Sequence, residues 1–523
     1  MTILKNIINA YSLHRLNLVL NSVFYRFSLD RRDNTFLPTK FMTDPWSGNP
    51  DTGKDIINGT MRDSEFTVNL SEIFTKKYHP GVNYVKYVFC FAWIRDLQAV
   101  GGNNSMKFTR DLILMFIDNY RGTRKFWLDT DGWAIFVTAE RIINLIFSYS
   151  FFASGSNDSV QKKILSSLSE QYSHLWRCYT SELNSLAKIA ALKAIFICLC
   201  SMRSIQSTKI KKIIKEICCV AEEEFDKSGM LMNYNPVDHF NVFRNFIEIR
   251  FMAKNIGIDL PKRIFSDLLS EMASCVRFFR LGDGMISNQI GDKDDKELTI
   301  TPSRQLIDTA LSVVESKKSG EKTITGFMRL STKRMVIIVN TLPRHVKSHF
   351  NPPSEPGLNI FDFEASFGVR RPIKLSDVSV LSNGMRVKIG KHSKYFADRN
   401  IENNKLLFTG EVIQKNHYFD FTFKRKIEIH LNQEKVSGTD TVYMSGSFYI
   451  FSRFILDRNV TLKKIHTRCI LVTIDNCEYI FSIAPDNKDC EIFITDESWP
   501  FYPMIEICRA ANHNNQISWS IET

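Results

Sequence analysis

The 523-residue sequence has no uncharged apolar run of about 18 residues, so it predicts no integral membrane segment. Residues 1–27 mix apolar and basic side chains and lack both a clean apolar stretch and a small-residue cleavage site, so we predict no signal peptide. Their helical spacing favours a helix packed on its own domain over one resting on a membrane. The 11 cysteines form no metal-ligand pairs, and those in apolar runs are expected to be buried small hydrophobic residues. This usage is typical of a reducing compartment or of a chain without disulfides.

The chain carries a basic surplus but no nucleic-acid-binding motif. Its net charge is +12, which favours a polyanionic partner such as nucleic acid, an anionic membrane surface or an acidic polysaccharide. The lysines between Lys209 and Lys215 are three and four residues apart, which is typical of a solvated helix face. We therefore predict no nucleic-acid partner. The 40 phenylalanines suit either a large core or a carbohydrate site, because aromatic rings stack on sugar faces.

Two halves of the sequence follow different patterns. From about Val82 to Arg280 the apolar spacing predicts consecutive helices with short links, which form antiparallel helical hairpins. The predicted helices are Asn103–Tyr120, Trp133–Phe152, Lys162–Cys178, Leu183–Cys200, Ile210–Phe225, Asn241–Ile256 and Pro261–Phe279. After Gly320, short runs rich in β-branched and aromatic residues predict a β-sandwich. The boundary is expected within Gly291–Lys322.

Five stretches occur in an order that resembles heparinase II/III-like proteins. They are Asp44–Thr60, Phe89–Gly102, Trp133–Phe152, Arg277–Ser287 and Asn359–Glu364. The resemblance implies an incomplete (α/α) toroid over residues 1–310, including an N-terminal amphipathic helical segment. It implies an antiparallel β-sandwich over residues 320–523. It also implies a polysaccharide lyase that acts on a uronate-containing anionic glycan, without a cofactor, in the cell envelope or periplasm. The missing signal peptide favours the cytoplasm as the alternative location.

Such lyases cleave by β-elimination in a cleft between toroid and sandwich. A base removes the proton at C5 of the uronate, a cationic or amide group neutralises the adjacent carboxylate, and an acid protonates the departing O4. Donors placed against the developing negative charge supply much of the rate. A Tyr or His with a suitable pKa can act as base and acid.

The best candidate site in the helical half is the stretch Tyr234–Phe246. By resemblance, Arg244 and Asn245 would neutralise the carboxylate, and His239 or Tyr234 would transfer protons. Asn241 occupies the position of the family's histidine and is assigned to substrate binding. Helix capping is the structural alternative, because Asn235 before Pro236 is an ordinary helix start.

The sheet half departs from the family pattern. Three histidines expected by resemblance are replaced, and His417 is a shifted candidate for proton transfer. Glu364 matches the family's acidic strand residue and Arg453 lies in a matched stretch, so both are assigned to substrate binding. For Glu364 the alternative is a solvated surface carboxylate. Because the histidines are missing, we predict no metal site.

Trp93 and Arg95 complete the predicted substrate-binding set. For Trp93 the alternatives are core filling and sugar stacking. For Arg95 they are a helix-surface pair with Asp96 and a contact with substrate. Two other functions compete with a lyase: a glycan-binding or envelope protein that has lost catalysis, and a glycoside hydrolase. A hydrolase needs two carboxylates across one cleft, and the helical half offers no obvious inward pair.

Overall fold

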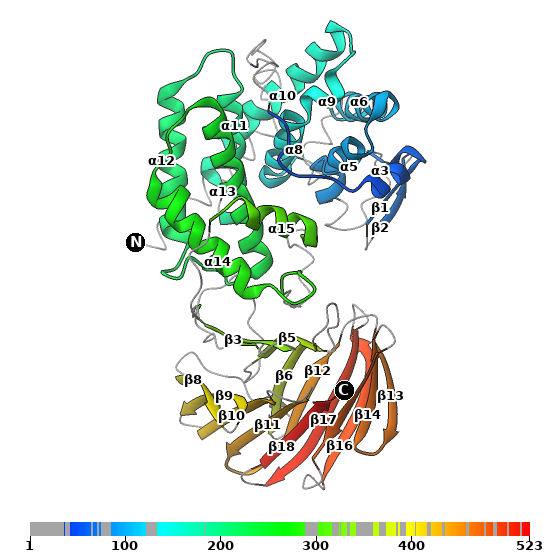
Figure 1. Ribbon diagram of the computed structural model, residues 1–523, viewed down its shortest axis with the longest axis vertical. Coiled ribbons are helices and arrows are strands. Elements are labelled where there is room, and N and C mark those ends of the chain that lie inside the picture. Colours follow the sequence, from blue (N-terminus) through cyan, green and yellow to red (C-terminus); the bar gives the residue numbers. More distant parts are fainter. Residues whose placement is uncertain are drawn as a thin grey trace.

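A computed structural model describes most of the chain between residues 36 and 522. The longer segments outside the described residues are 1–35, 75–84, 122–132, 288–301, 316–323, 341–358, 366–372 and 387–393. Helices come first and strands follow, which confirms the predicted fold class (Figure 1). The helices of the first part are α3 Pro50–Ile57, η2 Val85–Phe89, α5 Trp93–Val100, α6 Gly102–Arg121, α8 Ile135–Phe147, α9 Tyr149–Ala153, α10 Asp158–Cys178, η4 Tyr179–Ser181, α11 Ser185–Cys200, α12 Ser207–Glu224, α13 Pro236–Ile256, η5 Arg263–Leu268, α14 Leu269–Phe279 and α15 Arg304–Ser312.

Local sequence explains where α13 begins and ends. The side chain of Asn235 accepts hydrogen bonds from the backbone N–H groups of Val237 and Asp238, and Pro236 occupies the first turn. Gly257 ends the helix in the left-handed conformation, with φ of 71°. The helix therefore starts five residues before the predicted Asn241, at the cap that the sequence indicates.

The predicted helix Trp133–Phe152 is two helices. α8 ends at Phe147 and α9 begins at Tyr149, with Ser148 between them at ψ of 6°. The N–H of Ser148 bonds to the carbonyl of Asn144 at 3.2 Å and so closes the last turn of α8. Apolar residues continue across this break, which is why periodicity alone does not detect it.

The strands form one small hairpin and two large sheets. The hairpin joins β1 Thr60–Asp63 to β2 Phe66–Asn69. One sheet has the order β16-β17-β12-β6-β5-β4-β3 with β7 beside β6, and the other has the order β13-β14-β15-β18-β11-β10-β9-β8. The bounds are β3 Phe327–Ser331, β4 Met335–Asn340, β5 Asn359–Ala365, β6 Ile373–Ser382, β7 Met385–Arg386, β8 Lys394–Glu402, β9 Lys405–Lys415, β10 Asp420–His430, β11 Lys435–Met444, β12 Ser447–Ile455, β13 Thr461–His466, β14 Cys469–Ile474, β15 Cys477–Ile483, β16 Cys490–Ser498, β17 Tyr502–Asn512 and β18 Asn515–Glu522. Each pairing described is antiparallel.

The two sheets share one core. Alternate residues of β10 and β11 point inward, and they pack with residues of β12 from the opposite sheet. Arg425 and Asp440 form a fully buried bidentate ion pair in this core, with Nε–Oδ1 and Nη2–Oδ2 distances of 2.5 and 2.8 Å. Ser452 of β12 donates to the same carboxylate at 2.9 Å, so this polar contact joins the two layers.

The helical and sheet parts meet through the β3–β4 hairpin. Phe327 belongs to the core of the helical part and packs edge-to-face on Phe279, with ring centroids 4.9 Å apart. Arg329 donates to the carbonyls of Phe278 and Arg280 at the end of α14. Figure 1 shows the strands of this hairpin and β5 on the side of the sheets nearest the helices.

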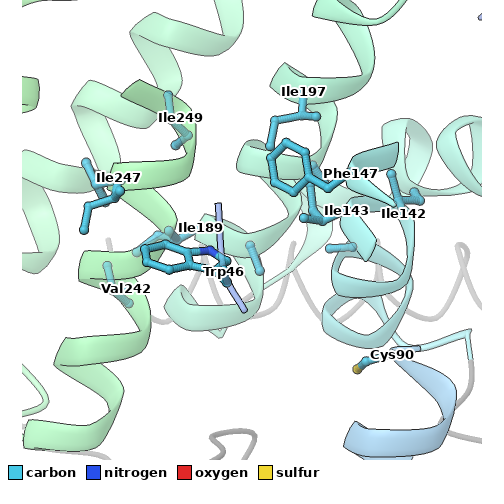
Figure 2. Close-up of a cluster of buried hydrophobic side chains, with 14 of the residues drawn as sticks. Trp46, Cys90, Ile142, Ile143, Phe147, Ile189, Ile197, Val242, Ile247 and Ile249 are labelled. Atoms are coloured by element: carbon cyan, nitrogen blue, oxygen red, sulfur yellow. The ribbon is translucent and has the colours of Figure 1, made fainter. Parts of the chain in front are cut away.

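A short N-terminal segment, residues 42–49, runs across the helical part, and we call it the N-terminal strap. Asp44 forms an ion pair with Arg95 of α5 at 2.6 Å, and the indole Nε1 of Trp46 donates to Glu248 of α13 at 2.6 Å. Trp46 is buried among apolar side chains of α8, α11 and α13 (Figure 2). Gly48 lies against the backbone of Arg95, where any Cβ would overlap the carbonyl oxygen. The strap therefore joins two helices that are far apart in sequence.

Candidate active site

A cluster of buried charged groups lies between α8, α11 and α13. At its centre is Lys193 of α11, which has no solvent exposure. Its ammonium group contacts Glu140 Oε1 at 2.7 Å, Glu248 Oε2 at 2.8 Å and Asn245 Oδ1 at 2.7 Å. An ammonium group has three N–H donors, and here two of them form hydrogen bonds, to Glu140 and to Asn245. The contact with Glu248 is an ion pair without hydrogen-bond geometry.

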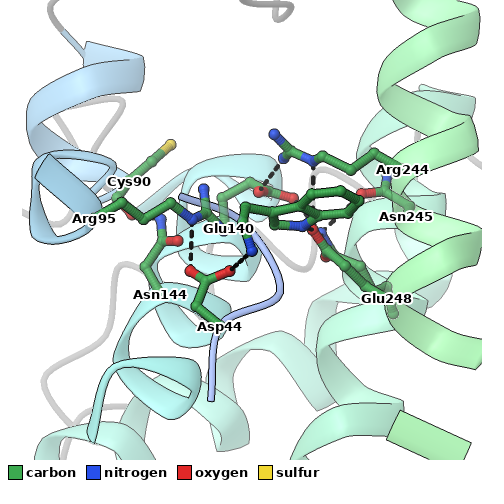
Figure 3. Close-up of polar contacts among 10 residues, drawn as sticks. Asp44, Cys90, Arg95, Glu140, Asn144, Arg244, Asn245 and Glu248 are labelled. Carbon is green, nitrogen blue, oxygen red and sulfur yellow. Dashed lines mark hydrogen bonds and ion pairs between the residues drawn. The ribbon is translucent and has the colours of Figure 1, made fainter. Parts of the chain in front are cut away.

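Two arginines flank this centre. Arg244 contacts Glu140 Oε2 through Nη2 at 3.2 Å and Glu248 Oε1 through Nε at 3.3 Å. Arg95 is held by Asp44 of the strap. Figure 3 shows the guanidinium groups of Arg95 and Arg244 on opposite sides of Glu140. The strap therefore contributes one of the three carboxylates of this cluster.

Charges in the cluster balance. Its carboxylates are Asp44, Glu140 and Glu248, and its cations are Arg95, Lys193 and Arg244. Burial alone would raise the pKa of Glu140, but Lys193 and Arg244 lower that pKa to about 2. Burial acts to lower the pKa of Arg95, yet Asp44, Glu248 and Glu140 more than offset this and raise it. The pKa shifts of Glu140 and Arg95 therefore both favour the ionised form near neutral pH.

Three N–H-bearing groups at the edge of the cluster still have donor capacity. Nη1 of Arg244 and Nδ2 of Asn245 make no hydrogen bond to any residue that the structure describes. Nη2 of Arg95 is buried and also has no partner among those residues. The side chain of Arg244 is 15% exposed and Asn245 is 5% exposed, so a ligand could reach this edge. Such an arrangement suits a carboxylate, which accepts several hydrogen bonds.

The structure does not bring Tyr234 to this edge. Arg244 lies eight positions after Pro236 in α13, which at 1.5 Å per residue is about 12 Å along the helix. Tyr234 lies instead at the junction with the sheets, where its ring is 6.4 Å from that of Phe327 and its backbone is left-handed, with φ of 56°. Burial and the neighbouring Asp226 carboxylate raise the pKa of Tyr234.

His239 has a structural position. It is fully buried, its Nδ1 accepts from the N–H of Leu231 at 3.2 Å, and its Nε2 lies 3.1 Å from the carbonyl of Met272. Because Nδ1 is the acceptor, Nε2 must be the donor, and both ring nitrogens are occupied by backbone. This corrects the expectation of proton transfer, and we leave His239 out of the proposed site.

Asn241 and Trp93 are also engaged by the protein itself. The amide nitrogen of Asn241 donates to the carbonyl of Val237, one turn earlier in α13. Trp93 is fully buried, and its Nε1 donates to the carbonyl of Val88 at 3.1 Å. Of the two alternatives for Trp93, core filling is the one that the structure supports. Arg95 pairs with Asp44 rather than with its neighbour Asp96, which instead accepts from the N–H of Asn49 at 2.7 Å.

Among the predicted residues of the sheet half, Arg453 has a described side chain, and its contacts are made within the sheets. Arg453 of β12 forms an ion pair with Glu506 of β17 at 2.5 Å and lies over the ring of Phe451. Glu364 is part of β5 and pairs in register with Val336, and its side chain lies outside the description. His417 lies outside the described residues altogether.

Sequence analysis missed Glu140, Lys193, Glu248 and Asp44. Each of the first two interrupts an apolar helical run, AIFVTAERIINLIF for Glu140 and IAALKAIFIC for Lys193. A charged residue inside such a run must be buried with a partner, because an unpaired buried charge is too costly. A charged residue within an apolar helical run is therefore a signal that the sequence itself contains. It does not identify the partner, since Lys193 lies 53 residues from Glu140 and 52 from Asn245.

Solved heparinases have the same fold as this chain. A crystal structure of heparinase III aligns with a TM-score of 0.63 at 11% identity, covering 94% of this chain and 88% of that protein. The heparan sulfate lyase HepC from Pedobacter heparinus aligns with a TM-score of 0.51 at 10% identity, covering 95% and 87%. The heparinase III-BT4657 gene product aligns with a TM-score of 0.54 at 11% identity, covering 92% and 86%. No protein-family model and no curated protein matches the sequence. The helical toroid and β-sandwich implied by the resemblance are thereby confirmed at the level of fold.

The described part of the chain contains neither a cluster of metal-ligating side chains nor a helix suited to cross a membrane. No group of three or more His, Cys, Asp or Glu side chains there is arranged to hold a metal ion. None of the helices described combines the length and the apolar character that crossing a bilayer requires.

Proposed function

We propose that the protein is a polysaccharide lyase that cleaves a uronate-containing anionic glycan by β-elimination. The observation that carries this proposal is the pair Arg244 and Asn245, adjacent on α13, each with a donor left over at the edge of the buried cluster. The toroid-and-sandwich fold shared with solved heparinases supports it.

The donor pair would act on the carboxylate of the sugar. Removal of the C5 proton places a second negative charge next to that carboxylate, and positioned donors stabilise this charge without reorganising. Because the cluster is already charge-balanced, the carboxylate is held by directed hydrogen bonds more than by net charge. Arg244 supplies one donor through Nη1 and Asn245 another through Nδ2.

Proton transfer involves groups beyond this pair. The raised pKa of Tyr234 keeps its phenol neutral near pH 7, which suits an acid that protonates a leaving O4 and disfavours a base. Its separation from Arg244, about 12 Å along α13, exceeds the spacing between O4 and the carboxylate of one sugar, so we do not assign this step to Tyr234. His417 remains our candidate for the base.

A glycan-binding protein without catalysis is the second candidate function. It is favoured by His239, whose ring nitrogens are both bound to backbone. A glycoside hydrolase is disfavoured, although Glu140 and Glu248 do form the inward carboxylate pair that the sequence did not reveal. A hydrolase acid needs a raised pKa, and the pKa of Glu140 is lowered to about 2.

Incubation with alginate, heparan sulfate and hyaluronan tests the proposal. A lyase creates unsaturated ends that absorb in the ultraviolet, a hydrolase creates reducing ends without them, and a binding protein creates neither. Arg244→Ala and Asn245→Ala should each lower the lyase rate by about 100-fold, as expected for losing a donor to a developing charge. Lys254→Ala, an exposed position on the same helix, should leave it unchanged. Undiminished rates in both site variants would rule out the carboxylate-neutralising pair.

A further inference from the structure

We propose that Lys193 is a positioning residue that sets the direction of the Asn245 amide, so that Asn245 offers its N–H₂ group, and not its oxygen, to the substrate. The inference rests on the proposed function, because it concerns how the same site selects a sugar acid. Lys193 itself has no solvent exposure and contacts no substrate.

Lys193 occupies a costly position. α11 is apolar along most of its length, and its buried residues on either side of Lys193 are Leu192 and Ala194. A buried ammonium group is tolerated only with a full set of acceptors. Here Glu140 and Glu248 both form ion pairs with Lys193, which would suffice for the charge, and the neutral oxygen of Asn245 accepts a further hydrogen bond. The geometry thus couples the buried ion pairs to one particular amide.

This contact determines which way the amide faces. An ammonium group has no lone pair and can only donate, so the atom of Asn245 that lies 2.7 Å from Nζ is the oxygen. The nitrogen is therefore on the other side of the amide, away from Lys193. Arg244 and Asn245 then present donors on the same edge, which is what a carboxylate requires.

Removing Lys193 reverses this direction. The groups left facing the amide would be Glu140 and Glu248, and carboxylates only accept hydrogen bonds. Asn245 would rotate to donate its N–H₂ group to them, because its oxygen would otherwise face carboxylate oxygens, which cannot donate to it. Its oxygen would then face the substrate and repel a sugar carboxylate. Since the cluster carries no net charge, this amide direction decides whether an acidic or a neutral sugar is preferred.

The experiment compares an acidic glycan with its neutral counterpart. Binding of hyaluronan and of carboxyl-reduced hyaluronan is measured by calorimetry for the full chain and for Lys193→Met. We measure the preference for the acidic form as the ratio of the two affinities. This ratio should fall by about tenfold or more in Lys193→Met, because one hydrogen bond to a charged group contributes that much. General loosening of the site would weaken both ligands and leave the ratio unchanged, and that result would overturn the inference. Lys188→Met, on the same helix, should keep the ratio of the unmodified protein.

A second variant covers the case in which Lys193→Met does not fold. Lys193→Met alone also leaves one excess negative charge, which would itself disfavour an acidic sugar. In Lys193→Met with Glu140→Gln one positive and one negative charge leave together, so the buried cluster stays balanced, and the ratio should still fall; a ratio equal to that of the unmodified protein would overturn the inference.

A separate measurement does not depend on any glycan. Asn245→Asp keeps an oxygen opposite Lys193 and Asn245→Leu does not, so the Leu variant should melt at the lower temperature. The reverse order would overturn the amide direction itself. If the Leu variant melts at the lower temperature but the unmodified protein binds neither glycan, the proposed function fails while the assignment of the amide stands. If the Leu variant melts at the lower temperature and the ratio of the two affinities does not change in the Lys193 variants, the inference fails while the proposed function stands.

Discussion

Replacing His174 by Gln should make the helical part of the protein less sensitive to mild acid. His174 lies in α10 and is 5% exposed, with its Nε2 3.2 Å from the carbonyl of Trp133 and its ring edge-to-face with that indole. Burial lowers its pKa from 6.5 to about 4; the hydrogen bond to the Trp133 carbonyl opposes this, and the nearby Arg141 and Arg177 charges make smaller contributions that lower it. The folded protein therefore keeps this imidazole neutral.

The expected size follows from this difference in pKa. Between pH 6.5 and 4 the unfolded chain binds a proton at His174 and the folded chain does not, so stability is complete above this range and is lost as the pH falls through it. At about 1.36 kcal/mol per pH unit, lowering the pH from about 7 to about 4.5 should cost roughly 2.5 kcal/mol through this residue alone.

Urea unfolding followed by far-ultraviolet circular dichroism measures this loss. Gln at position 174 can still donate to the carbonyl of Trp133 but cannot titrate, so the variant should lose about 2.5 kcal/mol less than the unmodified protein over the same pH range. Carboxylates that titrate contribute equally to both proteins and cancel in the comparison. His430→Gln, in β10 of the sheet part, serves as the matched control and should not change the acid sensitivity of the helices. Equal losses in the unmodified protein and His174→Gln would refute the reasoning.

Two further predictions concern the sandwich core. Arg425→Met should destabilise the sheet part by about 3–5 kcal/mol in chemical denaturation, because Asp440 is left as an unpaired buried charge. Arg425→Met combined with Asp440→Leu should recover most of that loss. A double variant that is no more stable than the single variant would contradict this account. Gly438→Ala should lower the thermal stability by about 1–3 kcal/mol, because its Cβ would overlap the ring of Trp519 on the neighbouring strand. Trp519→Leu combined with Gly438→Ala should remove the loss of stability that Gly438→Ala causes. A loss that persists would show that the backbone conformation of residue 438, and not the contact with Trp519, is its cause.

Much of the fold could be predicted because its signals are local. Apolar spacing locates α6, α10, α11, α12 and α14, and Asn235 with Pro236 indicates the start of α13. Alternation locates the sheet strands for the same reason. The break at Ser148 was not predictable, since apolar residues continue through it.

The candidate site was predictable only in part. Arg244 and Asn245 stand out by their resemblance to a family motif. What they bond to depends on contacts between residues about 50 to 100 positions apart, such as Arg244 with Glu140 across 104 residues. Patterns within a single element carry no information on such pairs. For the same reason, local sequence did not decide whether Trp93 and His239 lie in a core or in a site; the backbone partners of their ring nitrogens decide it.

The N-terminal strap has a consequence for how helical domains of this kind can gain or lose hairpins in evolution. Because Asp44 and Trp46 fasten α5 to α13 from outside the helical series, the link between these two helices does not depend on direct packing of one on the other. Lengthening a tether by a few residues adds only a few tenths of a kcal/mol of chain entropy. A lineage could therefore gain or lose a hairpin between α5 and α13 and keep the two helices linked by adjusting one short segment.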